Sequence, residues 1–381
     1  MTSRRHSGQE PCRVVIAGGG TGGHLFPGVA IARELIARRP DARVTFAGTQ
    51  RGIESKVIPR EGFELDLLRS AGLKGRSGAA VVRGLAVLPL SFLDAWRILS
   101  RRTPHLVIGV GGYSSGAVVM VAALRRIPTL LAEQNAVPGV TNRILSHVVR
   151  AAAVTFESTV SYFGRRAFVA GNPVRPEFFD TDGTAMDLES RTTDQGSRTT
   201  DHADARVLIF GGSQGAHAIN VAMVEAAPRL AAAGGVDITH QTGERDLELV
   251  RRAYREQGLA ARVEPFLFDM DREMKRADVI VSRAGATTIA ELTAAGRPAI
   301  LVPLPTAADD HQTKNAQVLA RANAAELIHQ KDLTGALLAD RVIALARDTA
   351  RREAMARAAR GLARPDAARV IVDKVLELAG C

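Results

Sequence analysis

Short apolar runs rich in β-branched residues alternate with longer stretches of helical periodicity along the chain. This alternation is typical of parallel sheets that helices cover on both faces. The first series of runs comprises Arg13–Gly18, Arg43–Gly48, His105–Gly109, Thr129–Ala132, Ala152–Phe156 and Phe168–Ala170. The second comprises Arg206–Phe210, Asp237–His240, Arg262–Phe266, Asp278–Ser282, Pro298–Val302 and Ala325–His329. Each series opens with a strand that leads into a glycine-rich turn and a helix, so the sequence predicts an α/β protein of two doubly wound, Rossmann-like domains.

The boundary between the two domains is expected near residue 173, where Pro173 and Pro176 bracket a short extended link. Residues 1–173 then form the first domain and residues 174–364 the second. The stretch 180–205 is rich in Asp, Thr, Ser and Gly without apolar periodicity, which predicts a disordered insertion. A last helical pattern in residues 365–381 comes too late for the second sheet, and we expect it to return to the first domain.

The composition limits the class of partner. The net charge of +10 calls for an acidic partner, and phosphate groups, anionic lipid and nucleic acid all meet that need. Aromatic residues make up only 4% of the chain, which disfavours stacking on nucleic-acid bases. No apolar run approaches the roughly 18 residues of a spanning helix, so any membrane contact is expected to be peripheral. The two cysteines, Cys12 and Cys381, show neither zinc spacing nor a disulfide framework, which fits a reducing cytoplasm.

Three glycine-rich turns follow predicted strands. In the first, Gly18, Gly20 and Gly23 have the spacing of a loop whose backbone N–H groups meet an anion at a helix N-terminus. The second strand ends in Gly48-Thr49-Gln50 without the acidic residue that a ribose of NAD needs, so NAD is disfavoured. Residues 109–116 and 211–215 form the other two turns. One such turn taken singly favours a tight βα connection, whereas three on two domains favour a diphosphate ligand in a cleft between them.

A second candidate binding segment spans residues 282–291. It reads as a strand end, a glycine turn and a helix that carries Thr287 and Thr288 and then Glu291. The helix N-terminus and its hydroxyls can bind phosphate, and the carboxylate can accept ribose hydroxyls. Thr288 and Glu291 also have the spacing of a capping box, and the pattern alone leaves both interpretations open.

Taken together, the motifs resemble the MurG family of glycosyltransferases. The residues that carry the resemblance are Thr21-Gly22-Gly23-His24, Phe26-Pro27-Gly28, Gly111-Gly112-Tyr113, Glu133-Gln134-Asn135, residues 171–175, Gly212-Ser213-Gln214-Gly215 and residues 285–291. The resemblance implies a GT-B fold, with the two domains facing across a cleft. It also implies an inverting hexosyltransferase of peptidoglycan synthesis that moves N-acetylglucosamine from UDP-GlcNAc to lipid I and gives lipid II.

The resemblance assigns roles residue by residue. It places the donor on Thr21, Gly22, Gly23, Asn135, Arg175, Ser213, Gln214, Phe266, Leu267, Thr288, Glu291 and Gln312, and the acceptor phosphates on Gly20, Gly111, Gly112 and Tyr113. Within the donor set, Glu291 would hold the ribose, Phe266 and Leu267 the uracil, and Gln312 the sugar. Two positions depart from the family pattern: Ala132 stands where a His precedes Glu-Gln-Asn, and His311 stands where a Gln precedes Gln312.

Inverting transfer needs a base for the acceptor hydroxyl and positive charge for the departing diphosphate. His24, directly after the first glycine loop, is the candidate base or acceptor-phosphate contact; a purely local role in hydrogen-bonding the turn is equally consistent with the sequence. Enzymes of this kind generally rely on helix dipoles and basic side chains, and we expect neither a metal nor a cofactor.

The region from Arg69 to Arg102 predicts a docking surface for an anionic membrane, on its cytoplasmic face. Its basic residues are Arg69, Lys74, Arg76, Arg83, Arg97, Arg101 and Arg102 against one acid, Asp94, and its apolar residues at helical spacing are Leu85, Leu88, Phe92, Trp96 and Leu99. The alternative is that the apolar face packs on the first sheet. Pro89 interrupts the pattern and allows two short helices in place of one.

Two other functions remain open from the sequence. A UDP-sugar epimerase would share the UDP-sugar site without consuming a lipid acceptor. A phosphate-binding regulatory or scaffold protein at the membrane surface would bind ligand without turnover. Nucleic acid is the least favoured partner.

Overall fold

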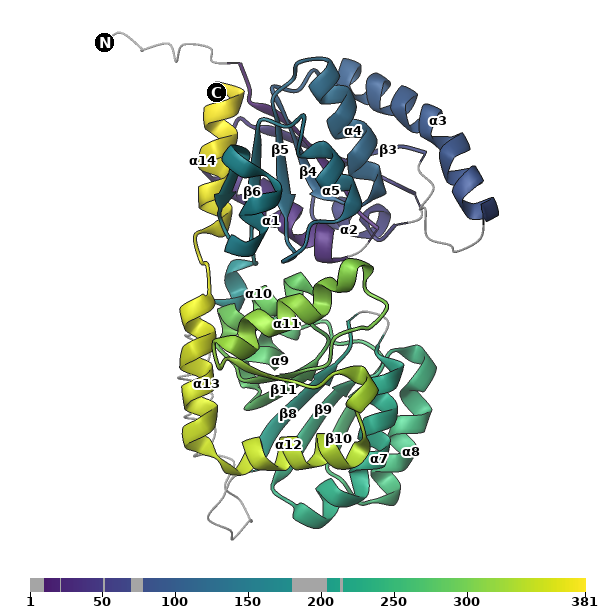
Figure 1. Ribbon diagram of the computed structural model, residues 1–381, viewed down its shortest axis with the longest axis vertical. Helices are drawn as coiled ribbons and strands as arrows, with labels where there is room; N and C mark the ends of the chain where they lie inside the picture. Colours follow the sequence, from purple (N-terminus) through teal and green to yellow (C-terminus); the bar gives the residue numbers. More distant parts are fainter. Residues whose placement is uncertain (1–9, 21, 51, 70–77, 180–203, 213–214) are drawn as a thin grey trace, which may run out of the picture. The chain divides into compact units, whose positions relative to one another are not determined.

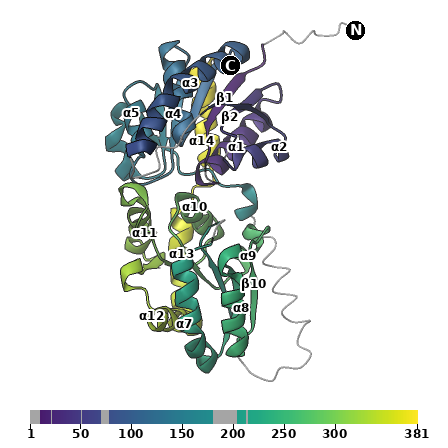
Figure 2. The same ribbon diagram turned by 90° about the vertical axis from the view of Figure 1, so that its right-hand side faces the viewer.

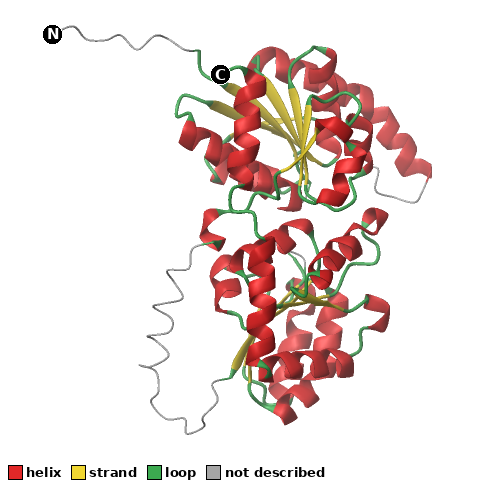
Figure 3. Cartoon of the chain, turned by 60° about the vertical axis from the view of Figure 1, so that its left-hand side comes forward, coloured by secondary structure: helices red, strands yellow, loops and turns green. Residues whose placement is uncertain are grey.

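The computed structural model describes residues 10–20, 22–50, 52–69, 78–179, 204–212 and 215–381. The chain divides into two compact units (Figure 1). Unit 1 comprises Met1–Pro173 together with Asp366–Cys381, and unit 2 comprises Val174–Pro365. Each unit is built on its own sheet, with helices on both sides of the strands (Figure 3).

Unit 1 contains a seven-stranded parallel sheet in the order β3-β2-β1-β4-β5-β6-β7. The strands are β1 (Arg13–Gly18), β2 (Arg43–Gly48), β3 (Glu64–Leu67), β4 (Leu106–Gly111), β5 (Thr129–Glu133), β6 (Ala151–Val154) and β7 (Ala167–Val169). The order reverses between β1 and β4, where Val14 pairs with Leu106 and Gly18 with Gly111. In an open parallel sheet, ligands bind at such a switch point, outside the carboxyl ends of the strands.

Alternate residues of each strand in unit 1 face opposite helix layers. Val14 and Ile16 pack with α1 (Gly22–Arg38), α2 (Glu54–Arg60) and α14 (Ala367–Ala379). Val15 and Ala17 pack with α3 (Gly78–Arg102), α4 (Tyr113–Leu124) and α5 (Val140–Leu145). Short 3-10 turns, Glu157–Tyr162 and Gly164–Arg166, lie between β6 and β7. The period-2 pattern of the strands thus fills two cores, one on each face.

Unit 2 repeats the design with six parallel strands in the order β10-β9-β8-β11-β12-β13. These strands are β8 (Ala205–Phe210), β9 (Val236–Gln241), β10 (Ala261–Glu264), β11 (Val279–Ser282), β12 (Ala299–Leu301) and β13 (Ala325–Leu327). The helices are α7 (His217–Ala233), α8 (Leu247–Glu256), α9 (Met270–Arg276), α10 (Ala286–Ala295), α11 (His311–Arg321), α12 (Gly335–Arg347) and α13 (Thr349–Leu362). Short 3-10 turns are Pro176–Phe178, Glu244–Asp246, Ala308–Asp310 and Gln330–Asp332. This strand order is that of a dinucleotide-binding sheet, and the two doubly wound sheets confirm the predicted fold class.

Three features differ from the sequence-based expectations. Strand β3 was not predicted, and α3 is a single helix of 25 residues with Pro89 inside it rather than two short helices. The predicted exposed stripe on α3 is also divided, because Leu99 is fully buried in the core while Trp96 is 54% exposed. Residues 180–203, most of the predicted insertion, lie outside the described residues.

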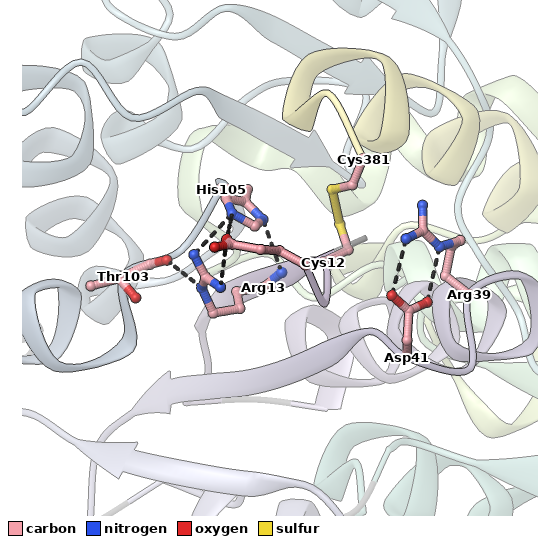
Figure 4. The surroundings of a disulfide bond; sticks show 8 residues. Cys12, Arg13, Arg39, Asp41, Thr103, His105 and Cys381 are labelled. Atoms are coloured by element: carbon pink, nitrogen blue, oxygen red, sulfur yellow. Dashed lines mark hydrogen bonds and ion pairs between the residues drawn. A yellow bond between two sulfur atoms is a disulfide. The ribbon is translucent and has the colours of Figure 1, made fainter. Parts of the chain in front are cut away.

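Helix α14 returns to unit 1 after the chain has completed unit 2. Its residues Ile371, Val372 and Val375 are buried in the core with α1, beside which α14 lies in Figures 1 and 2. This docking brings Cys381 to Cys12, just before β1, and the two form a disulfide with a Cα–Cα distance of 5.7 Å (Figure 4). The expectation that the two cysteines form no disulfide was wrong. The partners are 369 residues apart, so the pairing depends on the return of α14 and not on any local spacing.

Candidate active site

His24 lies at the switch point of the sheet in unit 1. It belongs to the first turn of α1, and its half-buried ring lies against the loop that follows β4. A Cβ added to Gly111 would come within 2.8 Å of His24 Nδ1, and Gly111 has a φ of +99°. A residue with a side chain would therefore displace the imidazole. The second glycine turn thus supports His24, which the sequence placed only beside the first turn.

A hydrogen bond fixes the orientation of the His24 ring. The Nε2 amide of Gln134 donates to the carbonyl oxygens of Val110 and Ala132, at 3.2 and 3.1 Å. Its Oε1 therefore faces His24 Nδ1, 3.2 Å away, and accepts the proton of that nitrogen. In the neutral ring, the lone pair is then on Nε2, the arrangement that a general base requires.

One backbone N–H of the first glycine loop is already bound by a carboxylate of the protein. The N–H of Gly20 donates to Glu54 Oε2 at 2.8 Å. Gly20 was predicted to bind an acceptor phosphate, and in this structure its N–H group has an internal acceptor. Thr21, assigned to the donor by resemblance, lies outside the described residues, and Gly22 and Gly23 begin α1.

The segment Glu133-Gln134-Asn135 is held by the buried Glu133. One carboxylate oxygen accepts from the N–H and the side-chain amide of Asn135, at 3.0 and 3.2 Å, and the other accepts from Asn142 at 2.8 Å. Ala132, the first departure from the family pattern, points into the core of unit 1. A buried alanine there provides no catalytic group, and the ring of His24 is oriented by Gln134.

In unit 2, α10 carries the candidate ribose site at the switch point between β8 and β11. The helix begins at Ala286 after Gly285, its N-cap, and Thr288 is its third residue. Thr288 is therefore not the N-cap, and the capping-box interpretation of Thr288 and Glu291 is wrong. Glu291 is half-buried; burial raises its pKa to about 7, the Arg175 guanidinium opposes this shift, and the Asp271 carboxylate adds to it.

The segment predicted to contact uracil follows β10. Phe266 is 44% exposed and packs edge-on against Phe268, with ring centroids 5.0 Å apart. Leu267 is only 3% exposed, and its N–H donates to Gln241 Oε1 at 2.9 Å. The structure therefore offers the ring of Phe266 to a ligand, whereas the side chain of Leu267 belongs to the core.

Gln312 is held at the start of α11 by its amide oxygen. Oε1 accepts the N–H groups of Ala284 at 3.3 Å and Leu304 at 3.0 Å. The amide nitrogen is thus the group that can donate to sugar hydroxyls. Two successive residues, Asp309 and Asp310, adopt left-handed φ values of 53° and 54° immediately before His311 and Gln312. Such backbone conformations cost energy and often occur at functional sites.

The glycine turn after β8 adjoins a polar network that sequence analysis missed. Ser213 and Gln214 lie outside the described residues. His217, the first residue of α7, contacts both oxygens of the buried Asp246 carboxylate through Nδ1 at 3.0 Å, and Asn220 donates to Asp246 at 2.8 Å. Asn220 also bonds the buried His240, whose pKa burial lowers to about 3. Polar residues at α-helical spacing after a glycine turn, as at His217 and Asn220, are the signal that could have revealed this network.

Comparisons with known proteins agree with this arrangement. Residues 14–154 match the glycosyltransferase family 28 N-terminal domain, and residues 206–371 match its C-terminal domain. The chain is 46% identical to the UDP-N-acetylglucosamine–N-acetylmuramyl-(pentapeptide) pyrophosphoryl-undecaprenol N-acetylglucosamine transferase of Anaeromyxobacter sp. (strain K), over 96% of this chain and 93% of the relative. The chain belongs to the MurG family of glycosyltransferases.

Further relatives strengthen the assignment to the MurG family. The Syntrophus aciditrophicus transferase of the same description is 50% identical over 87% of this chain and 88% of its own length. The crystal structure of Acinetobacter baumannii MurG superposes with a TM-score of 0.75 at 29% identity, covering 96% of this chain and all of that one. A UDP-GlcNAc 2-epimerase from Neisseria meningitidis has a TM-score of 0.66 at 13% identity over 96% of this chain, which shows a shared fold alone.

Proposed function

We propose that this chain is an inverting hexosyltransferase that moves N-acetylglucosamine from UDP-GlcNAc to the lipid-linked N-acetylmuramyl-(pentapeptide) acceptor, lipid I, and so forms lipid II in peptidoglycan synthesis. The names of the curated relatives support the donor, the acceptor and the reaction. The observation that carries the chemistry is the hydrogen bond from His24 Nδ1 to Gln134, because it leaves Nε2 of the neutral ring as a base.

In the proposed mechanism, His24 Nε2 takes the proton of the acceptor hydroxyl as its oxygen bonds to C1 of N-acetylglucosamine. The bond from C1 to the UDP oxygen breaks, UDP leaves with that electron pair, and the configuration at C1 inverts. The departing diphosphate gains negative charge, and the N-terminus of α7 after the glycine turn is suited to stabilise it. The proposed mechanism uses only side-chain and backbone groups of the protein.

Unit 2 is proposed as the donor half-site. Glu291 would accept the ribose hydroxyls, Phe266 would contact the uracil, and the amide nitrogen of Gln312 would donate to the sugar. Arg175 lies over the ring of Phe178, with its guanidinium carbon 5.2 Å from the ring centroid, and acts electrostatically on Glu291. Ser213 and Gln214 are proposed phosphate or ribose contacts, and Asn135 in unit 1 a contact for the sugar or diphosphate.

Unit 1 is proposed as the acceptor half-site and as the surface that docks on the cytoplasmic face of an anionic membrane. Among the described residues, no helix is both long and apolar enough to cross a membrane. Helix α3 exposes Leu88, Leu90, Leu93 and Trp96, and Arg125 of α4 stacks on Trp96 at 4.8 Å. An exposed apolar face rimmed by arginines fits a lipid surface of negative charge.

The charge of this face is smaller than the sequence indicated. Arg69 pairs with Asp94, and both Arg101 and Arg102 pair with the buried Asp66. Arg97, which is 74% exposed, remains directed to solvent with a long 3.8 Å contact to Asp94. Arg76 lies outside the described residues. The proposed docking therefore depends more on the apolar residues than on the count of basic residues.

The decisive test of this function is a turnover assay with labelled UDP-GlcNAc and a short-chain lipid I analogue. We expect label to appear in the lipid product with one UDP released per transfer. Isomerisation of UDP-GlcNAc, or release of its sugar, without formation of labelled lipid would identify an epimerase. Tight UDP binding without any turnover would identify a binding protein.

A further inference from the structure

Glu54 lies fully buried beneath the first glycine loop of unit 1. It is the first residue of α2 and has 0% of its surface exposed. Oε2 accepts the N–H of Gly20, and Oε1 accepts both the N–H and the hydroxyl of Thr49, each at 2.8 Å. All three groups can donate, so they suit a carboxylate, which only accepts. Among the described residues, no Lys or Arg side chain forms an ion pair with it.

Backbone without side chains surrounds this carboxylate on several sides. A Cβ added to Gly19, Gly48 or Gly52 would overlap the side chain of Glu54. These glycines come from the ends of β1 and β2 and from the turn before α2. Glycine backbone with N–H donors next to a helix N-terminus is what a phosphate-binding loop provides. Here the bound anion is part of the chain.

The position of this loop is linked to that of His24. Gly20 lies two residues before α1 begins, and His24 is in the first turn of that helix. The carbonyl oxygen of Gly19 packs so closely on the second glycine turn that a Cβ on Gly112 would come within 2.7 Å of it. Gly111 of that turn supports the imidazole ring. A shift of the first loop would therefore move both the first turn of α1, which carries His24, and the second glycine turn, on which its ring packs.

We propose that Glu54 is a positioning residue of the acceptor half-site: by accepting the N–H of Gly20 and the donors of Thr49, it holds the first glycine loop in the shape that presents His24. This inference rests on the proposed transferase function. It assigns the N–H of Gly20 to an internal contact and not to substrate.

Glu54→Gln tests the positioning role with little change in volume. Its amide NH2 would face the N–H of Gly20 or the donors of Thr49, so the loop must move. A misplacement on the order of 1 Å is expected to lower kcat by about 100-fold. The UDP affinity, measured by calorimetry, should stay within about twofold, because unit 2 is untouched. The NMR resonances of the His24 imidazole should shift, and this change reports the position of the ring independently of activity.

Glu54→Ala tests whether the site holds an anion. The variant should lose kcat as well, and added formate should restore it with saturation by entering the vacated site. Asp66→Asn is the matched control, since Asp66 is also a buried carboxylate of unit 1 but pairs with Arg101 and Arg102. It should keep kcat on a water-soluble acceptor and ignore formate. Inorganic pyrophosphate added to the wild type should leave the Gly20 amide resonance unmoved.

The proposal is overturned if both Glu54 variants keep kcat within about threefold and His24 resonances do not change. It is also overturned if Asp66→Asn loses as much activity as Glu54→Ala and formate restores neither, or if pyrophosphate displaces the Gly20 amide. Absence of transfer by the wild type would instead count against the transferase function, and the His24 and Gly20 resonances would still decide the role of Glu54.

Discussion

Glu54 in unit 1 and Glu291 in unit 2 are two acids beside glycine turns at equivalent edges of similar sheets, and their surroundings are opposite. Glu54 is fully buried and accepts three donors from the backbone and side chain of its own unit. Glu291 is half-buried, and burial with Asp271 nearby raises its pKa to about 7. A carboxylate that already accepts three donors of the protein fixes the conformation of those donors. A carboxylate whose pKa is raised by burial is instead suited to be stabilised by the hydroxyl groups of a ligand.

The largest expected effect concerns the base in unit 1. His24→Ala should lower transfer by about 10³-fold, because a positioned base typically contributes 10²–10⁴. UDP affinity should survive, since the proposed UDP-contacting residues lie in unit 2. Rates are measured with the lipid I analogue and affinity by calorimetry, with His147→Ala, an exposed histidine of the same unit, as the control. Full transfer by the His24 variant would remove this residue from the mechanism.

The next effect concerns Glu291, the acid proposed to hold the ribose. Glu291→Ala should raise the Kd for UDP by about 100-fold, because two hydrogen bonds to a charged acceptor are worth a few kcal/mol. Glu256→Ala, at an exposed position on α8, serves as the control. A Kd within threefold of the wild type would mean that Glu291 does not hold the ribose, and the contrast with Glu54 would fail.

The raised pKa of Glu291 predicts a pH dependence. Below about 7 the acid holds its proton, and only the carboxylate accepts both ribose hydroxyls at full strength, so uridine affinity should rise as pH increases through 7 and then level off. At pH 6 about one-tenth of the group is ionised, so the change to pH 8 is about tenfold. Uridine is used in place of UDP because the phosphate of UDP itself titrates near pH 6 and would add a second pH dependence. Glu291→Gln should give a flat profile; a rise that persists in this variant would assign the dependence to another group.

The smallest effect concerns the outer layer of unit 1. Replacing both Leu93 and Trp96 by Ser should weaken binding to anionic vesicles several-fold, because about half of each side chain is exposed on α3. Added salt should weaken it further through the arginines. Ile36→Ser, on α1 and thus in the opposite helix layer, should bind as the wild type does. Co-sedimentation that responds equally to both sets of substitutions would refute docking through α3.

The sequence predicted the strands well because buried parallel strands are continuous apolar runs with a glycine at their end, as in β1 and β4. Strand β3 was missed because Glu-Leu-Asp-Leu is a short edge strand whose one buried residue, Asp66, is charged. Glycine spacing located the turns but could not tell which anion they meet, since Glu54 is 34 residues from Gly20 and belongs to no local pattern. The Gln134 contact that orients His24 joins residues 110 positions apart, so it could not be predicted from the sequence for the same reason.

The Cys12–Cys381 bond closes residues 12–381 into a covalent ring, to which residues 1–11 are attached as a single tail. All of unit 2 lies within the ring, as a domain inserted between the two chain segments that build unit 1. A single peptide cut anywhere in residues 174–365 therefore separates no fragment, because both pieces stay joined through the sulfur atoms. Covalent release of a piece takes either two peptide cuts, or one cut together with reduction of the disulfide. In the unfolded state, the same closure limits how far the ends of unit 1 can diverge, so the bond favours its reassembly after unit 2 has come apart.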